Sequence, residues 1–322
     1  MHFVVKLGIF VACYAVFHAY ILGPYIAGGV CTSQARLDGK TVIITGSNTG
    51  IGKETALNLA KRGARVIMAC RNLQKAETAL QEIVQKSGNE NVVAKHLDLA
   101  SLKSVREFSE DVNSNELRLD ALINNAGVMC LSTLTRTEDG FEMHMAVNHL
   151  GHFLLTNLLL DLLKRSASSR IVVVSSMGHW MFTKTAFNFK NMNGEIAYEK
   201  FDAYGQSKLA NILFARELAR RLEGSGVTAN SLHPGVVASE LSRHLPMVMQ
   251  GNNVVASWFL KTSEQGAQTS IHLAVSEELE GVTGLYFADC KERTPAETAQ
   301  DDQAAKKLWE VSAKLVGLDT SV

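Results

Sequence analysis

Thr41-Val-Ile-Ile-Thr-Gly-Ser-Asn-Thr-Gly-Ile-Gly52 sets the architecture of this chain. Its β-branched start predicts a short buried strand, and Gly50–Arg62 carries apolar residues at helical spacing. Glycines between a strand and a helix allow a tight turn and let backbone N–H groups approach a pyrophosphate at the helix N-terminus. The G-x-x-x-G-x-G spacing therefore predicts a dinucleotide site, although a glycine-rich turn is the plainer alternative. That site would comprise Gly46, Ser47, Asn48, Thr49, Gly50, Ile51 and Gly52.

The same succession of strand, turn and helix repeats along the chain. Short apolar runs alternate with longer segments of helical period, which is typical of a parallel sheet covered by helices on both faces. The predicted strands are Thr41–Thr45, Arg65–Cys70, Asn91–Leu97, Ala121–Asn124, Arg170–Ser175, Val227–His233 and Gly284–Phe287. The predicted helices are Gly50–Arg62, Asn72–Lys86, Ser101–Val112, Gly140–Lys164, Ala203–Leu222 and Ser263–Ser276. The fold class is accordingly α/β, a doubly wound parallel seven-stranded sheet of the Rossmann type.

The composition fits one folded unit of neutral charge. The chain has 322 residues, with 32 basic and 32 acidic side chains. That balance predicts no nucleic-acid partner, because it leaves no excess of basic side chains for a phosphate backbone. Five scattered cysteines, without C-x-x-C or any metal-ligand spacing, indicate a reducing compartment and no metal site. We expect residues 38–322 to form a single domain, with an apolar substrate lid around 238–262.

The N-terminus differs in kind from the rest of the chain. Residues 7–30 contain no Asp, Glu, Lys or Arg. A helix of that length spans about 36 Å, enough for a bilayer core of about 30 Å. We expect residues 1–37 to form a membrane anchor and linker, with a cleaved signal peptide as the alternative. Basic residues are more frequent after the run than before it, so the main domain is expected to face the cytosol.

Polar residues follow three of the predicted strands, where a cofactor of a doubly wound fold would lie. Arg71 follows the second strand and suits a ribose 2′-phosphate, which predicts NADP(H) rather than NAD(H); the alternative is a surface arginine. Asp98 follows the third strand, where it would contact the adenine or merely cap the next helix. Asn125 follows the fourth strand, where it would lie beside the cofactor or form an Asx turn.

Tyr204 and Lys208 lie four residues apart in a predicted helix and therefore share one face. A free phenol titrates near pH ~10, and a fixed positive charge beside it favours the phenolate and lowers that pKa. Such a tyrosine can act as a general acid or base on a carbonyl or an alcohol. The pair alone would also fit an ordinary solvated helix, so its meaning depends on the segments that precede it.

Taken together, these motifs resemble those of the short-chain dehydrogenases/reductases. The resemblance rests on Thr45–Gly52, Asn124–Gly127, Asn148, Ser176 and Tyr204-x-x-x-Lys208, and extends from residue 38 to about residue 290. Finer features resemble the microsomal retinol dehydrogenases that use NADP(H). These include Gly29-Val30-Cys31, Phe141-Glu142-Met143-His144, Val147-Asn148-His149-Leu150-Gly151-His152-Phe153 and His233-Pro234-Gly235-Val236-Val237.

The resemblance implies a catalytic role for four residues. Tyr204 would be the general acid in carbonyl reduction and the base in alcohol oxidation. Lys208 would lower the pKa of Tyr204 and bind the nicotinamide ribose. Ser176, rather than its neighbour Ser175, would hydrogen-bond the substrate oxygen. Asn148 would hold a water in a proton relay behind Lys208.

The resemblance also implies the remaining cofactor contacts and the partners. Pro234 and Gly235 would lie beside the nicotinamide ring, and Ser239 would bond its carboxamide. An anchor beside an apolar lid suggests a lipophilic substrate, and the resemblance implies that this substrate is a retinoid. Other lipid aldehydes, or sterol or polyprenoid carbonyls, are the alternative, as is a membrane-tethered NADPH-binding protein with little turnover. The resemblance further implies the endoplasmic reticulum membrane and a homodimer formed through the helices around Asn148 and Tyr204.

Overall fold

The computed structural model of this chain describes residues 26–183, 185–238, 241 and 260–318. Most of the expected anchor, Ser239 and nearly all of the expected lid at 238–262 therefore lie outside the described residues. Within the described ranges, no helix is long and apolar enough to span a bilayer.

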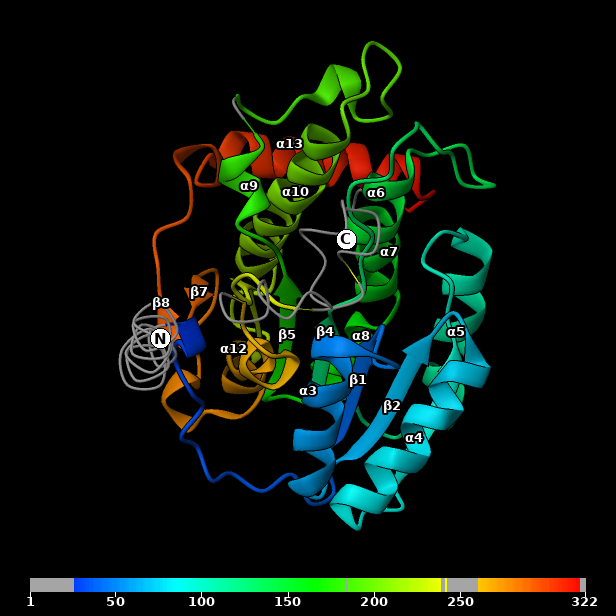
Figure 1. Cartoon of the computed structure of the whole chain (residues 1–322), viewed down its shortest axis with the longest axis vertical. Helices are drawn as coiled ribbons and strands as arrows, with labels where there is room; N and C mark the ends of the chain where they lie inside the picture. The colour runs from blue at the N-terminus through cyan, green and yellow to red at the C-terminus, as the bar shows by residue number, and fades with distance from the viewer. Residues whose placement is uncertain (1–25, 184, 239–240, 242–259, 319–322) are drawn as a thin grey trace, which may run out of the picture.

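A twisted sheet in the strand order β3-β2-β1-β4-β5-β6-β7-β8 forms the centre of the molecule (Figure 1). The strands are β1 (Thr41–Thr45), β2 (Arg65–Cys70), β3 (Val92–His96), β4 (Ala121–Asn124), β5 (Ser169–Val174), β6 (Val227–His233), β7 (Tyr286–Ala288) and β8 (Lys291–Glu292). All neighbouring pairs from β3 to β7 are parallel, and β8 pairs antiparallel with β7. The doubly wound prediction is confirmed, but the predicted number of seven strands is wrong. The eighth strand was missed because its two residues are charged and exposed, so no apolar pattern marks it.

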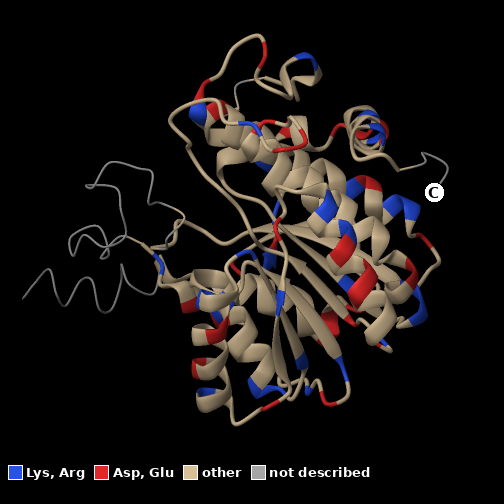
Figure 2. Cartoon of the chain, turned by 90° about the vertical axis from the view of Figure 1, so that its right-hand side faces the viewer, with Lys and Arg blue, Asp and Glu red and all other residues tan. Residues whose placement is uncertain are grey.

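Helices cover both faces of the sheet, as the alternating pattern predicted. The first group is α3 (Gly50–Lys61), α4 (Leu73–Ser87) and α12 (Ser263–Val275), which pack with one apolar cluster. The second group is α5 (Leu102–Asn115), α7 (Gly151–Leu158), α8 (Leu160–Arg165), α10 (Lys200–Arg221) and α13 (Asp302–Leu315), which pack with the other. In β1, Ile43 belongs to the second cluster and Ile44 to the first, as expected for a strand buried on both sides. Basic and acidic residues are interspersed over the outer helices (Figure 2).

The predicted continuous helix over Gly140–Lys164 is wrong. The segment consists of α6 (Met143–Met145), a π-helical turn η2 (Ala146–Leu150), α7 and α8. Glu142 caps α6, since its carboxylate accepts hydrogen bonds from the backbone N–H groups of His144 and Met145. Hydrophobic periodicity did not reveal the π turn, because its apolar residues remain buried as they would in an α-helix. π turns inside helices occur frequently at functional sites, and this one carries Asn148.

The C-terminal helix α13 was not among the predicted elements. It packs against α10 and crosses it in the view of Figure 1. The ring centroid of Trp309 lies 4.9 Å from that of Phe153 and 5.9 Å from that of Phe214. Ser312 Oγ lies 2.8 Å from His149 Nε2. The helix thus covers an aromatic surface formed by α7 and α10.

Candidate active site

The glycine-rich turn between β1 and α3 is shaped for a bound phosphate. Gly46 and Gly50 have φ angles of +66° and +56°, a conformation that residues with side chains rarely adopt. A Cβ at Gly52 would lie 2.5 Å from Gly46 O, so a side chain there would fill the turn. Helix α3 begins without a side-chain cap on Thr49 and without an acidic residue in its first turn. Its first N–H groups are therefore oriented for an anion, and the turn fits a dinucleotide pyrophosphate.

Asn125 connects this turn to the loop after β4. Its side-chain Nδ2 donates to Thr45 O at 2.8 Å, and its backbone N–H donates to Thr45 Oγ1 at 2.9 Å. Ala126 N also donates to Thr45 Oγ1, which lies 2.8 Å from His152 Nε2. The side chain of Asn125 thus braces the turn from β4 rather than forming an Asx turn. Ser47 has a similar role, since its hydroxyl donates to Ile44 O within the turn.

Thr45 and His152 were not recognised as site residues from the sequence. His152 Nδ1 lies 3.1 Å from Asn148 O, to which it donates, so Nε2 accepts from the hydroxyl of Thr45. Burial lowers the pKa of His152 to about 3, which keeps the imidazole neutral in this chain of contacts. No sequence motif pairs these two residues, which lie 107 positions apart.

Arg71 and Asp98 follow β2 and β3 at the edge of the sheet where β1 ends in the glycine turn. Arg71 is exposed, which leaves its guanidinium accessible to a ligand. One carboxylate oxygen of Asp98 accepts from Ala100 N at 2.9 Å, and the N-cap of α5 is Ser101. Asp98 therefore stabilises the turn before α5 and is not the cap itself.

Tyr204 and Lys208 lie together on α10, as their spacing predicted, and both are only 3% exposed. Lys208 Nζ lies 5.9 Å from the centroid of the Tyr204 ring and donates to Val174 O at 3.1 Å. Ser176 follows β5, and its side chain lies near enough to Tyr204 to influence the pKa of the phenol. Its neighbour Ser175 instead donates to Lys208 O at 2.7 Å. The structure therefore brings Ser176, Tyr204 and Lys208 together and gives Ser175 a supporting contact.

The pKa of Tyr204 differs from the sequence-based expectation. Burial raises it to about 12, while the side chain of Ser176 opposes that change. Burial also lowers the pKa of Lys208 to about 8. The predicted lowering of the phenol pKa by Lys208 is not found, because desolvation disfavours both charged forms and the ammonium bonds to a carbonyl instead of the phenol. Tyr204 is thus a protonated acid at neutral pH.

Asn148 lies behind this group on the π turn. Its Oδ1 accepts from Val128 N at 2.8 Å, and its Nδ2 donates to Val128 O at 3.0 Å and to Ser207 Oγ at 2.8 Å. A Cβ added to Gly127 would lie 3.1 Å from Asn148 Oδ1 and 3.5 Å from Lys208 Nζ. The two polar groups therefore approach the same point of the backbone, where a Cβ would crowd the side chain of Asn148.

The loop after β6 carries Pro234 and Gly235, which the sequence assigned to the cofactor site. Gly235 has a φ of +88°, and its N–H donates to His233 Nδ1 at 3.1 Å. A Cβ there would lie 2.8 Å from Lys261 Cε, and Lys261 Nζ pairs with Asp289 Oδ1 at 2.5 Å. Gly235 thus rests against the side chain of Lys261, which forms an ion pair with Asp289 that the sequence did not reveal.

Comparisons with known proteins agree with this architecture. The family model described as short chain dehydrogenase matches residues 40–247. Human retinol dehydrogenase 13 is 52% identical over 309 residues, which cover 94% of this chain and 92% of that protein. Human retinol dehydrogenase 11 is 51% identical over 306 residues, which cover 94% of this chain and 95% of that protein.

Two solved structures show the same fold. A Mycobacterium paratuberculosis protein is 33% identical, with a TM-score of 0.74 over 92% of this chain and 100% of that one. The Pseudomonas aeruginosa RhlG/NADP active-site complex is 26% identical, with a TM-score of 0.63 over 78% of this chain and 95% of that one. With its glycine turn, its buried Tyr204 and Lys208 and its half-buried Ser176, this chain belongs to the short-chain dehydrogenase family of oxidoreductases.

Proposed function

We propose that this protein is an NADP(H)-dependent oxidoreductase that interconverts a lipophilic alcohol and its aldehyde, with retinol and retinal as the substrate pair. The observation that carries the proposal is the grouping of half-buried Ser176 with buried Tyr204 and Lys208 at the edge of the sheet that also holds the glycine turn. The substrate is supported by the similarity to proteins named retinol dehydrogenases, at about half identity over nearly the whole chain.

The cofactor would lie along the carboxyl edge of the sheet, where the nicotinamide ring gives or accepts the hydride. The turn Gly46–Gly52 and the N-terminus of α3 would hold the pyrophosphate, with Asn125 bracing that turn. Arg71 would pair with a 2′-phosphate, and Asp98 lies one strand further, where the adenine would be placed. Pro234 and Gly235 would line the nicotinamide, and Ser239 would bond the carboxamide.

In carbonyl reduction, Tyr204 Oη holds the proton that passes to the substrate oxygen. A raised pKa keeps that proton in place at neutral pH until the oxygen gains charge. The hydroxyl of Ser176 donates to the same oxygen and stabilises the developing charge. Lys208 would bind the ribose and, together with a water held by Asn148, restore the proton on Tyr204. In alcohol oxidation the proton moves the opposite way.

The site is bordered by apolar residues that suit a lipophilic substrate. Trp180 and Met181, on the short helix α9 (Gly178–Met181) that follows Ser176, are 53% and 52% exposed. An N-terminal anchor in the endoplasmic reticulum membrane, with the domain on the cytosolic side, would let such a substrate enter from the bilayer. A homodimer formed through α7 and α10 would have to displace α13 from that surface or use what α13 leaves uncovered.

The test is an activity screen of the detergent-solubilised full-length chain with each nicotinamide cofactor against retinal, other lipid aldehydes, sterol and polyprenoid carbonyls, and small soluble carbonyls. We expect the highest kcat/KM for retinal with NADPH. Turnover of soluble carbonyls with none of retinal would overturn the substrate assignment.

A Tyr204→Phe variant separates an enzyme from a binding protein. It should bind NADPH like wild type and lose turnover by roughly 10²–10⁴-fold, the usual contribution of a positioned general acid. Equal turnover in variant and wild type would remove Tyr204 from the mechanism.

A further inference from the structure

The turn at Cys130 and Leu131, in the loop that follows β4, has an unfavourable backbone conformation. Cys130 has a φ of +54°, in the left-handed region that residues with a Cβ rarely occupy. Its side chain is only 1% exposed, and burial raises the pKa of its thiol to about 11. A neutral buried thiol supplies no strong hydrogen bond to hold such a turn. The conformation therefore depends on contacts from other segments.

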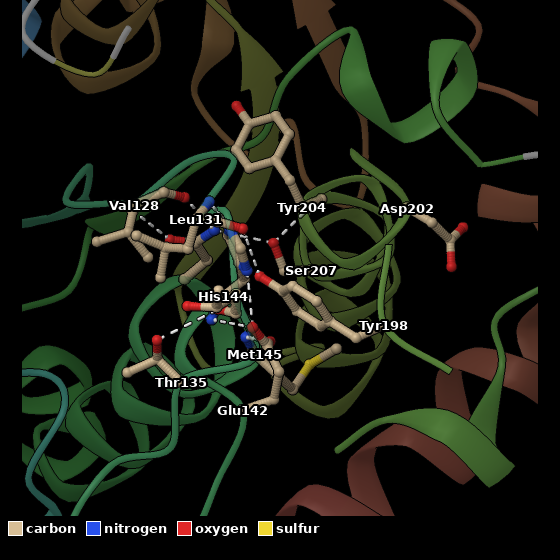
Figure 3. Close-up of polar contacts among 12 residues, drawn as sticks. Val128, Leu131, Thr135, Glu142, His144, Met145, Tyr198, Asp202, Tyr204 and Ser207 are labelled. Atoms are coloured by element: carbon tan, nitrogen blue, oxygen red, sulfur yellow. Dashed lines mark hydrogen bonds and ion pairs between the residues drawn. The ribbon is translucent and has the colours of Figure 1, made fainter. Parts of the chain in front are cut away.

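Two side chains hold the next residue, Leu131, by its backbone. Leu131 N donates to His144 Nε2 at 3.3 Å, and Tyr198 Oη donates to Leu131 O at 2.8 Å. Figure 3 shows these side chains converging on Leu131 from the helix α6 and from the segment before α10. Leu131 is thus held at both its backbone N–H and its backbone C=O. These two bonds fix the turn at Cys130.

His144 is itself oriented by Glu142. His144 Nδ1 lies 2.7 Å from Glu142 Oε1, and the two side chains are 0% and 3% exposed. Because Nε2 accepts from Leu131 N, Nδ1 carries the proton and donates to the carboxylate. The carboxylate also accepts from the backbone N–H groups of His144 and Met145. A buried, fully bonded carboxylate therefore fixes both the tautomer and the ring of His144.

His144 also contacts Tyr204. The His144 ring meets the Tyr204 ring edge-on at 6.3 Å between centroids, and stacks with Tyr198 at 6.4 Å. The Cys130 thiol is near enough to contribute to the raised pKa of Tyr204. A Cβ at Gly178 would lie 2.9 Å from Tyr204 Cε1, so α9 also packs closely on this ring. The ring of Tyr204 is therefore packed against both α9 and His144.

We propose that Glu142, His144 and Tyr198 are positioning residues that hold the strained Cys130–Leu131 turn against the Tyr204 ring and so form one wall of the carbonyl site. The proposal rests on the proposed function, because it assigns these residues to the geometry of the same proton transfer.

Kinetics of four variants test the proposal, with a retinal screen of wild type performed first. His144→Ala should lower kcat/KM roughly 10- to 100-fold, mostly in kcat, because small misplacements of a catalytic group reduce rates on this scale. The NADPH Kd should stay within about twofold of wild type. His144→Gln should recover most of the activity, since its amide oxygen can accept from Leu131 N.

The strain itself provides a matched pair of second-site changes. Adding Cys130→Gly to His144→Ala should restore part of the activity, because glycine adopts positive φ readily. Adding Cys130→Ala removes the same thiol without relieving the strain and should restore none. The proposal fails if His144→Ala keeps wild-type kcat/KM, or if glycine and alanine at position 130 have equal effects.

Alkylation of Cys130 gives a readout that does not depend on turnover. In folded wild type we expect iodoacetamide to modify Cys130 far more slowly than the partly exposed Cys31, as mass spectrometry would measure. Tyr198→Phe and His144→Ala should raise the Cys130 rate by roughly tenfold or more, and His144→Gln should return it toward wild type. If wild type turned over no carbonyl, the proposed function would fail. Unchanged Cys130 alkylation in folded variants would independently show that Glu142, His144 and Tyr198 do not hold the Cys130–Leu131 turn.

Discussion

At the scale of single residues, two adjacent serines of the same type have different contacts in the site. Ser175 and Ser176 are neighbours after β5, yet only Ser176 influences the pKa of Tyr204, whereas the hydroxyl of Ser175 donates to Lys208 O. The family resemblance selects Ser176 for the substrate contact, and this assignment stays a prediction. The two serines differ in their neighbours in the folded chain, which the periodicity of the sequence does not specify.

The two serines therefore predict opposite phenotypes. Ser176→Ala should lower kcat by roughly 10²–10³-fold, the usual loss when one donor to a developing oxyanion is removed, with little change in stability. Ser175→Ala should keep kcat near wild type and lower the free energy of unfolding by about 1 kcal/mol, through one lost hydrogen bond. Steady-state kinetics and urea unfolding of both variants measure this. Equal kinetic losses would show that the assignment between the serines is wrong.

Cofactor preference is a second prediction at this scale. Arg71→Asp should weaken NADPH binding by roughly 10- to 100-fold, because a charge-assisted bond to the 2′-phosphate is replaced by repulsion. NADH should then bind as well as NADPH or better. Lys75→Ala, which removes an exposed cation from the first turn of α4, is the control and should keep the wild-type preference. Competitive binding measurements decide, and an Arg71→Asp protein that still prefers NADPH would contradict the role of Arg71.

At the scale of elements, local signals predicted most helix and strand positions. Asn72 and Ser101 cap α4 and α5 as expected, because a cap bond lies within three residues of its donor. The break at Asn148 and the two-residue β8 escaped prediction, since neither changes the apolar pattern. Helix α13 was missed although its apolar face packs on α7 and α10.

Trp309 should carry much of the stability that α13 contributes. Trp309→Ala would remove an indole packed on Phe153 and Phe214, and we expect a loss of about 3–5 kcal/mol in the free energy of unfolding. Leu315→Ala, at the partly exposed end of the same helix, should cost less than about 1 kcal/mol. Chemical denaturation of both variants measures this. Similar losses at the two positions would mean that α13 does not depend on this aromatic contact.

At the scale of the whole molecule, burial controls the ionisation of several groups. His149 lies under α13 with its pKa lowered to about 3 by burial. Because this pKa lies below its value in the unfolded chain, the unfolded state binds more protons between the two values. The contribution of neutral His149 to the free energy of unfolding is therefore fully present above about pH 6.5. It is lost as the pH falls toward 3.

We expect the free energy of unfolding to decrease on acidification, with His149 contributing up to about 1.4 kcal/mol per pH unit in that window. His149→Gln can keep a hydrogen bond to Ser312 without titrating, so its slope should be smaller by up to that amount. His96→Gln, at an exposed position, is the matched control and should keep the wild-type slope. Denaturation curves between neutral pH and about pH 4 test this. Identical slopes for all three proteins would show that His149 does not couple folding to pH.

The sequence by itself determined the alternation of strands and helices, the glycine turn and the shared face of Tyr204 and Lys208. Each of these depends on residues within a few positions of one another, where backbone geometry and side-chain period suffice. Only the tertiary structure decided that Thr45 meets His152, that α13 covers α10, and that His144 and Tyr198 hold Leu131. It also decided that the pKa of Tyr204 is raised rather than lowered. These properties arise from contacts between distant segments and from burial, which exist only once the chain has folded.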